Sequence, residues 1–347
     1  MRAVSLSAKG NLSIPYSPTN PAPSSALRVF SDVKIPQPSR SGELLIRVNA
    51  TTVIRDALTW PETYIEEKKI LGHDFAGTVV SVNDESHDMP FKVGDEVYGM
   101  TEGSRAGAWA EYMVVNTEEA CVKPSRLSWV EAAAVPLSAL TAYQALFEKA
   151  SIRAPDFTRQ GRASGTHQVT AMKEVRILVI GASGCVGNYL VQLAKLAGAH
   201  VTAASSSNER NKDFLCALGA DDVVEYSDLT SSGKQYEVII DTVGGSVLKT
   251  CWSLVADNGS LISVDSASWN FVREHRDSGV AQEEGNVNAL FFIVSPSRRN
   301  LEQLSAALDD GLLKVFVAST LPLEDVRLAY DMSSRFTSKR GKVVLVL

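Results

Sequence analysis

Short apolar runs separated by turn-forming and polar residues fill the first third of this chain. They cover residues 43–48, 75–82, 95–98 and 111–115. Runs of this length, rich in β-branched and aromatic residues and bounded by turn residues, are typical of strands that pair through short connections. The pattern predicts a compact, mostly antiparallel β module.

The pattern becomes helical between residues 129 and 147, where apolar residues recur three and four positions apart and Pro136 interrupts the run. We expect a domain boundary near this point. The following segment, 151–173, is polar, contains Pro and Gly and holds no sustained period. It is typical of a surface insertion or linker.

From residue 175 onward, short apolar strands alternate with helical segments. The predicted strands cover residues 175–180, 200–204, 223–226, 238–241 and 260–264, and the predicted helices cover 186–196 and 211–218. This alternation predicts an α/β fold with a parallel, doubly wound sheet. A helix at 300–309 and a terminal strand at 342–347 return to a mixed pattern.

Composition and charge exclude several classes of partner. The 347 residues are 45% hydrophobic and 21% charged, as in a soluble globular protein of roughly two domains. The net charge of −6 offers no cationic excess for nucleic acid or an acidic membrane. No signal peptide is visible, and the longest uncharged run, between Arg176 and Lys195, contains several glycines and polar residues. We expect a small-molecule substrate, no nucleic acid and no membrane.

The four cysteines are widely spaced and form no C-x-x-C pair: Cys121, Cys185, Cys216 and Cys251. This spacing argues against a disulfide framework and against a structural zinc site. It favours a reducing compartment, and we expect a cytoplasmic protein.

A glycine-rich loop stands between the strand at 175–180 and the helix at 186–196. Small residues there let backbone N–H groups approach a pyrophosphate, and the helix N-terminus contributes roughly half a positive charge. The candidate cofactor-binding residues in this loop are Gly181, Ser183, Gly184, Cys185, Val186 and Gly187. The alternative is a tight turn that binds nothing; the βαβ context favours a dinucleotide.

The end of the next strand bears on the choice between NAD and NADP. NAD-binding proteins usually place an acidic residue about 20 residues after the loop, where it binds the ribose 2′-hydroxyl. Here the strand ends in Ser205, Ser206 and Ser207, and Glu209 comes only later, beside Arg210 and Lys212. Hydroxyls and cations suit a 2′-phosphate. We therefore predict NADP(H) bound through Ser205, Ser206, Arg210 and Lys212, the alternative being that both cations simply face water.

Seven blocks together resemble the medium-chain dehydrogenase/reductase superfamily, in particular its zinc-independent quinone oxidoreductase-like and enoyl reductase-like branch. The blocks are residues 72–80, 93–98, 132–143, 181–187, 218–221, 241–245 and 341–346. The resemblance implies a GroES-like, mostly-β catalytic domain, split into residues 1–130 and 290–347. It also implies a Rossmann NADP-binding domain at 131–289 and an active site in the cleft between the two.

The resemblance also implies further contacts with the cofactor, from Thr141, Tyr226, Val243, Gly244, Phe292 and Val294. Thr141, Val243 and Gly244 match positions that border the nicotinamide. Tyr226 matches an aromatic position near the adenosine phosphate, and the segment 292–294 matches one that closes over the nicotinamide. Many relatives pair through edge strands of the Rossmann domain, so a homodimer is an open expectation.

Zinc-containing members of the superfamily bind the catalytic ion through a Cys, a His in a Gly-His-Glu block and a further Cys or acid. Here His73 stands in Gly-His-Asp, while residues 53–57 supply no thiolate and residues 137–140 supply no third ligand. One imidazole does not make a tetrahedral site, although Asp56 or Asp74 could add oxygen ligands. We predict no metal and interpret His73 as a core or turn histidine.

Two side chains are candidates for a catalytic proton donor. Tyr64 lies in a region where some enoyl reductases of this branch carry a catalytic tyrosine, although its spacing to Gly72 is shorter than theirs. The alternative for Tyr64 is an aromatic that shields the core. Asp56 is the second candidate, and it could equally form a surface ion pair with Arg55.

The function that follows is NADPH-dependent hydride transfer to an α,β-unsaturated carbonyl or a quinone without a metal. Such a substrate accepts the developing charge on its own conjugated carbonyl. Two alternatives stay open: a zinc-dependent alcohol dehydrogenase, and a cofactor-binding accessory protein without turnover.

Overall fold

The computed structural model describes residues 1–7, 15–66, 69–83, 89–157, 175–231, 233–281, 286–334 and 339–347. The chain divides into two compact units, which are described separately. The first unit is made of residues 1–140 and 295–347, and the second of residues 141–294. Most of the predicted insertion at 151–173 lies outside the described residues.

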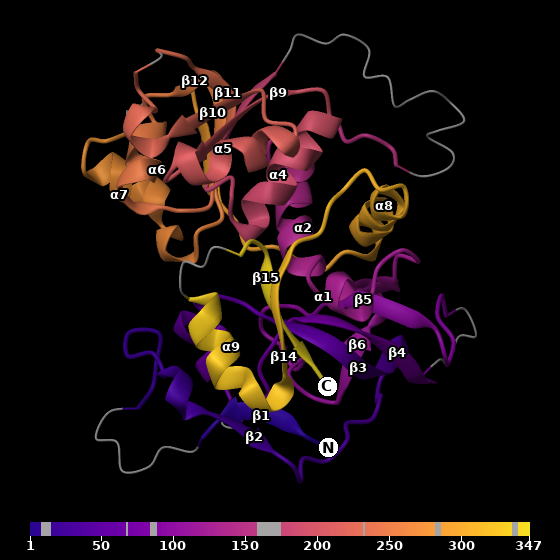
Figure 1. Cartoon of the computed structure of the whole chain (residues 1–347). Helices are drawn as coiled ribbons and strands as arrows, with labels where there is room; N and C mark the ends of the chain where they lie inside the picture. The colour runs from indigo at the N-terminus through magenta and orange to yellow at the C-terminus, as the bar shows by residue number, and fades with distance from the viewer. Residues whose placement is uncertain are drawn as a thin grey trace. The chain divides into compact units, whose positions relative to one another are not determined.

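The first unit is built on β-structure (Figure 1). Among the described residues it holds a seven-stranded sheet in the order β14-β15-β3-β4-β5-β7, with β6 paired to β3. The strands are β3 (Glu43–Val53), β4 (Asp74–Asn83), β5 (Glu96–Met100), β6 (Tyr112–Asn116), β7 (Ala120–Val122), β14 (Val317–Pro322) and β15 (Lys342–Val346). Only the β14–β15 pairing is parallel among these described pairs. A separate antiparallel pair joins β1 (Ala3–Leu6) to β2 (Leu27–Phe30).

The core of this unit follows from the alternation along its strands. One cluster joins Leu44 and Ile46 of β3 to Phe75 of β4 and Val97 of β5. A second cluster packs around Trp109, which is 1% exposed and donates its indole N–H to the Thr52 carbonyl.

The helices of the first unit are α1 (Trp129–Ala133), α2 (Pro136–Tyr143), α8 (Arg298–Asp309) and α9 (Val326–Ser333), and α2 runs on into the second unit. Short 3₁₀ turns cover Ser24–Ala26, Ala57–Thr59, Pro61–Tyr64, Thr117–Glu119 and Leu323–Asp325. Ser128 and Glu131 form a capping box that starts α1. Pro136 begins α2, a position where its missing N–H costs nothing.

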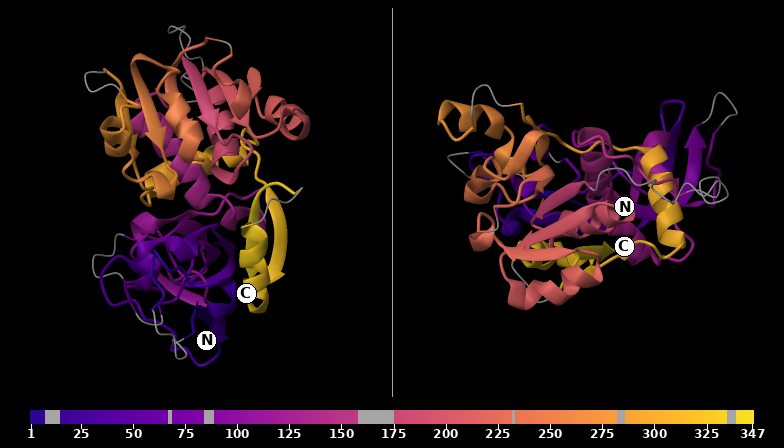
Figure 2. Two further views of the ribbon diagram at one scale, coloured as in Figure 1. Left: turned by 90° about the vertical axis from the view of Figure 1, so that its left-hand side faces the viewer. Right: turned by 90° about the horizontal axis from the view of Figure 1, so that it is seen from above.

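The second unit is a parallel α/β sheet in the order β10-β9-β8-β11-β12-β13. Its strands are β8 (Arg176–Ile180), β9 (His200–Ser205), β10 (Asp222–Glu225), β11 (Tyr236–Asp241), β12 (Val255–Ser263) and β13 (Asn288–Phe291). Its helices are α4 (Cys185–Leu196), α5 (Asn208–Ala217), α6 (Gly245–Cys251) and α7 (Phe271–Asp277). A π-helical turn covers Gln144–Lys149, and 3₁₀ turns cover Tyr226–Asp228 and Ser266–Ser268. Figure 2 shows helices flanking this sheet on both sides.

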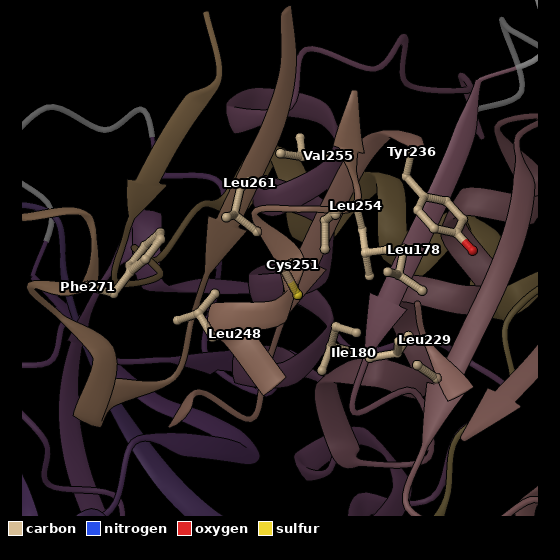
Figure 3. Packing of buried hydrophobic residues seen from close by; sticks show 12 residues of the cluster. Leu178, Ile180, Leu229, Tyr236, Leu248, Cys251, Leu254, Val255, Leu261 and Phe271 are labelled. Carbon is tan, nitrogen blue, oxygen red and sulfur yellow. The ribbon is translucent and has the colours of Figure 1, made fainter. Parts of the chain in front are cut away.

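All six strands are parallel, so their carboxyl ends lie along one edge of the sheet. The strand order reverses between β8 and β11, which places a switch point near the centre of that edge. A core cluster between the sheet and α6 joins Leu178 of β8, Leu248 and Cys251 of α6 and Leu261 of β12 (Figure 3). The predicted fold class, a Rossmann doubly wound sheet with a GroES-like β domain, is confirmed. Within the described residues, no helix has both the length and the apolar character needed to cross a bilayer.

Candidate functional site

The turn after β8 packs so tightly against neighbouring atoms that it requires glycine at two positions. Gly181 has a φ of +79°, and a Cβ placed on it would stand 2.1 Å from Thr242 Oγ1. A Cβ on Gly187 would stand 2.1 Å from the Gly181 carbonyl oxygen. Contacts this short require backbone or side-chain displacement, so the first turn of α4 packs directly against the end of β8.

The N-terminus of α4 opens onto this turn. Gly184 is the N-cap and supplies no side-chain hydrogen bond to the first-turn N–H groups. Residues 183–186 are partly or fully exposed. A helix of twelve residues that begins in this way offers oriented N–H groups to an anion. Gly181 and Gly187, which we call the glycine cradle, and the uncapped start of α4 fit the pyrophosphate of a dinucleotide.

Neighbouring strand ends bring Tyr226 and Val243 to the same turn. Burial raises the pKa of Tyr226, while the backbone N–H of Gly181 beside its hydroxyl opposes this shift. Val243 Cγ2 would stand 2.9 Å from a Cβ on Gly181. Thus Gly181, Tyr226 and Val243, which are dispersed along the sequence, are brought together at the carboxyl edge of β8, β10 and β11.

A buried carboxylate fixes the turn after β11. Asp241 accepts hydrogen bonds from the backbone N–H groups of Val243 at 3.1 Å and Gly244 at 3.0 Å, and from Ser263 Oγ at 2.7 Å. Burial raises the pKa of Asp241, although these hydrogen bonds oppose the shift. Gly244 has a φ of +72°, and a Cβ on it would stand 2.2 Å from Asp265 Oδ2. The Val243–Gly244 turn is therefore held in one conformation.

The end of β9 separates the predicted 2′ contacts into buried and exposed groups. Ser205 is fully buried, and its hydroxyl accepts a hydrogen bond of 3.3 Å from Asn211 Nδ2. Ser206, Arg210 and Lys212 are exposed beside it.

Sequence reasoning along a single strand missed Glu225. This residue ends β10, stands opposite Ser205 in the sheet and accepts a 2.6 Å hydrogen bond from the Asn208 N–H at the start of α5. A carboxylate expected to be absent from this corner is thus supplied by the adjacent strand. The only sequence signal for it is that β10 ends in an acidic residue.

The other predicted cofactor contacts lie in the same unit. Thr141 is buried on α2. Phe292 follows β13, where its N–H donates to the Ser263 carbonyl at 3.4 Å and Lys149 Nζ lies 5.5 Å from its ring centroid. Val294 is half-buried. Their contact with a cofactor stays a prediction.

The two candidate proton donors are both engaged in local structure in the first unit. The Tyr64 hydroxyl donates to the Leu58 carbonyl and accepts a 2.9 Å hydrogen bond from the Ala22 N–H. Burial raises the pKa of Tyr64. Asp56 lies 3.1 Å from Arg55 Nε in an ion pair whose side chains are about half exposed. The Arg55–Asp56 pair matches the surface ion pair given as the alternative for Asp56, and the part of either residue in proton transfer stays a prediction.

The residues around His73 do not fit a zinc ion. His73 is buried, its Nδ1 lies 3.4 Å from Thr101 Oγ1, and its ring packs beside Trp60 at 5.5 Å. Burial lowers the pKa of His73 to about 4. The adjacent Asp74 carboxylate is already bound by Lys342, Thr52 and the Leu137 N–H. Across the described residues, no group of three or more His, Cys, Asp or Glu side chains is placed to hold a metal.

Comparisons with known proteins match both parts of the chain. Residues 40–125 match the family model described as "Alcohol dehydrogenase GroES-like domain". Residues 218–345 match the model described as "Zinc-binding dehydrogenase".

Whole-chain relatives agree with these matches. The chain is 36% identical to "Probable zinc-binding oxidoreductase, mitochondrial" of Arthroderma benhamiae, with 88% of each chain covered. It is 30% identical to "Chloroplast envelope quinone oxidoreductase homolog" of Arabidopsis thaliana, covering 87% of this chain and 89% of the relative. The solved quinone oxidoreductase of Coxiella burnetii shares the fold, with a TM-score of 0.77 at 22% identity over 100% of this chain and 99% of that one.

The names of these relatives correct one expectation. The Arthroderma benhamiae relative is named as mitochondrial and the Arabidopsis thaliana relative as a chloroplast envelope protein. The prediction of a cytoplasmic location is therefore wrong. The physical reason is that scattered cysteines report only that disulfides are not required. They do not distinguish one reducing compartment from another.

Two relatives match over 87–88% of this chain at 30% identity or more. One family model covers 40–125 of the β unit, and the other covers 218–345, which takes in part of the nucleotide-binding unit and most of the C-terminal part of the β unit. The glycine cradle, the doubly wound sheet and the split β domain have the same explanation: the chain belongs to the medium-chain dehydrogenase/reductase superfamily of oxidoreductases, as a quinone oxidoreductase-like member.

Proposed function

We propose that this protein is an NADPH-dependent reductase that transfers a hydride to an α,β-unsaturated carbonyl or a quinone without a metal ion. The observation that carries the proposal is the glycine cradle at Gly181 and Gly187, joined to the Val243–Gly244 turn on one sheet edge. The name of the plant relative, a quinone oxidoreductase homologue, supports the acceptor class.

The proposal assigns a role to each part of the cradle. The N–H groups at the start of α4 bind the pyrophosphate, because an uncapped helix end stabilises an anion. Asp241 holds the Val243–Gly244 turn beside the nicotinamide by two backbone hydrogen bonds. When bound, NADPH supplies the hydride, and the protein supplies orientation.

The preference for NADPH rests on the surface after β9. Ser206, Arg210 and Lys212 are exposed there, and guanidinium and ammonium groups form charge-assisted hydrogen bonds with a phosphate. A 2′-phosphate on the adenosine ribose is the group that these side chains suit.

The proposed class of hydride acceptor rests on the side chains around His73, which are the candidate metal ligands. The side chains around His73 do not form a set of zinc ligands. They therefore hold no zinc ion that would act as a Lewis acid on an alcohol substrate. A conjugated carbonyl or quinone carries its own electron sink. The two candidate proton donors, Tyr64 and Asp56, are both held by local contacts, so the proposal does not depend on either of them as the donor.

The test is to follow NADPH absorbance with purified protein and a panel of enones and quinones, with and without a chelator. We expect oxidation with at least one acceptor that the chelator leaves unchanged. No oxidation across the panel while NADPH is bound contradicts the proposal, as does activity that disappears with the chelator and returns with zinc.

A further inference from the structure

One carboxylate lies where two strands and a helix meet at the edge of the sheet. Glu225 ends β10 and stands opposite Ser205, the last residue of β9. Its Oε1 accepts a 2.6 Å hydrogen bond from the N–H of Asn208, the first residue of α5. The Glu225 side chain therefore reaches the turn between β9 and α5. The function proposed above, on which this inference rests, places the ribose 2′ group at this turn.

A carboxylate at this turn affects the two cofactors in opposite ways. The 2′-hydroxyl of NADH can donate a hydrogen bond to it. The 2′-phosphate of NADPH carries between one and two negative charges near neutral pH, and a carboxylate repels it. Glu225 also uses the Asn208 N–H, which at a helix N-terminus would otherwise favour an anion.

The exposed cations on α5 favour NADPH. Arg210 and Lys212 lie within the first two turns of this helix and attract a phosphate. We infer that Glu225 offsets part of this attraction and is the residue that limits how strongly the protein prefers NADPH over NADH. The deciding carboxylate then lies on β10, one strand away from the end of β9.

Two substitutions separate the charge of Glu225 from its hydrogen bond, and a third serves as the control. Glu225→Gln removes the charge and keeps an oxygen that can accept from Asn208, whereas Glu225→Ala removes both. Asp257→Asn is the matched control. Asp257 is an exposed carboxylate near the amino end of β12, whereas Glu225 lies at the carboxyl end of β10. The dissociation constants of NADPH and NADH are measured by calorimetry on the full chain, at low and high KCl.

We expect Glu225→Gln to raise the preference for NADPH about tenfold at low salt, mainly through tighter NADPH binding. The gain should shrink at high salt, because mobile ions screen the repulsion. Asp257→Asn should leave the preference unchanged. Tighter binding cannot result from misfolding, so the expected result is specific to the charge.

An unchanged preference in Glu225→Gln, with both nucleotides bound, overturns the inference and leaves the proposed function intact. A preference that rises equally in Asp257→Asn also overturns it, because the effect is then one of overall charge. If the unmodified protein binds neither nucleotide, the proposed function fails and the inference fails with it.

Discussion

Asp74 and Lys342 form a buried ion pair between β4 and β15, although 268 residues separate them in the sequence. The same carboxylate accepts hydrogen bonds from Thr52 Oγ1 at 2.5 Å and from the Leu137 N–H at 2.7 Å. Because Asp74 is completely buried, each of these partners offsets part of its desolvation. One carboxylate thus joins β3, β4, β15 and the start of α2.

Removing the cation of this pair should strongly destabilise the first unit. Lys342→Met leaves the Asp74 charge buried without its ion-pair partner, and we expect a loss of about 3–5 kcal/mol in the free energy of unfolding. Urea unfolding followed by tryptophan fluorescence measures this loss, since the buried Trp109 reports on this core.

The control for Lys342→Met is Lys234→Met, which breaks the partly exposed pair with Asp222. We expect that change to cost at most about 1 kcal/mol. Equal losses in the two variants would show that the buried pair does not stabilise the unit.

Alanine at Gly187 should abolish tight nucleotide binding. Its Cβ would meet the Gly181 carbonyl at 2.1 Å, so the loop must move away from α4. Gly184→Ala should have a smaller effect, because its Cβ would meet the same atom at 3.2 Å. We expect NADPH to bind more than about tenfold more weakly to Gly187→Ala than to Gly184→Ala, a difference of about 1.4 kcal/mol or more. Similar affinities for the two variants would contradict the assigned cradle.

Stability should fall as the pH falls between about 6.5 and 4, in part because of His73. Burial lowers the pKa of His73 to about 4 from an ordinary value of 6.5, so in this range the unfolded chain binds a proton that the folded chain does not. The contribution of this group is complete above pH 6.5 and declines by about 1.4 kcal/mol per pH unit below it.

Urea unfolding of the unmodified chain and of His73→Gln, repeated across this pH range, isolates the contribution of His73. The variant should show a shallower pH dependence. Parallel pH profiles for the two proteins would mean that His73 is not buried in its neutral form.

Phenylalanine at position 64 distinguishes a catalytic from a structural hydroxyl. Because the Tyr64 hydroxyl bonds to the Leu58 carbonyl and the Ala22 N–H, we expect Tyr64→Phe to cost about 1 kcal/mol of stability and to leave kcat within a few-fold. Melting temperature and NADPH oxidation are measured on the same preparation. A fall in kcat of about a hundredfold or more with unchanged melting would identify Tyr64 as the proton donor instead.

Local patterns in the sequence predicted much of the fold. The strands β3, β4, β8 and β9 and the helix α4 follow from apolar periodicity, and the glycine turn stands between two of them. Other elements are too short for such a pattern: α6 and α7 have seven residues each, which is fewer than two full turns. The helix α5 starts at Asn208, before the expected residue 211, because Ser207 caps it.

Contacts between residues far apart in the sequence were harder to predict. Glu225 reaches Asn208 from a neighbouring strand, and Lys342 reaches Asp74 across most of the chain. Both depend on sheet order and register, which the periodicity of a single strand does not contain. For the same reason, sequence analysis placed no carboxylate beside Ser205.

Hydride transfer itself is tested most directly with NADPH that carries deuterium at the transferable position of the nicotinamide, and an enone acceptor. Mass spectrometry locates the label after turnover by the unmodified protein and by Gly187→Ala. We predict deuterium at the β-carbon of the saturated product from the unmodified protein, and little labelled product from the variant. Reduced enone without deuterium at that carbon, or labelled product formed equally well by Gly187→Ala, would contradict the account.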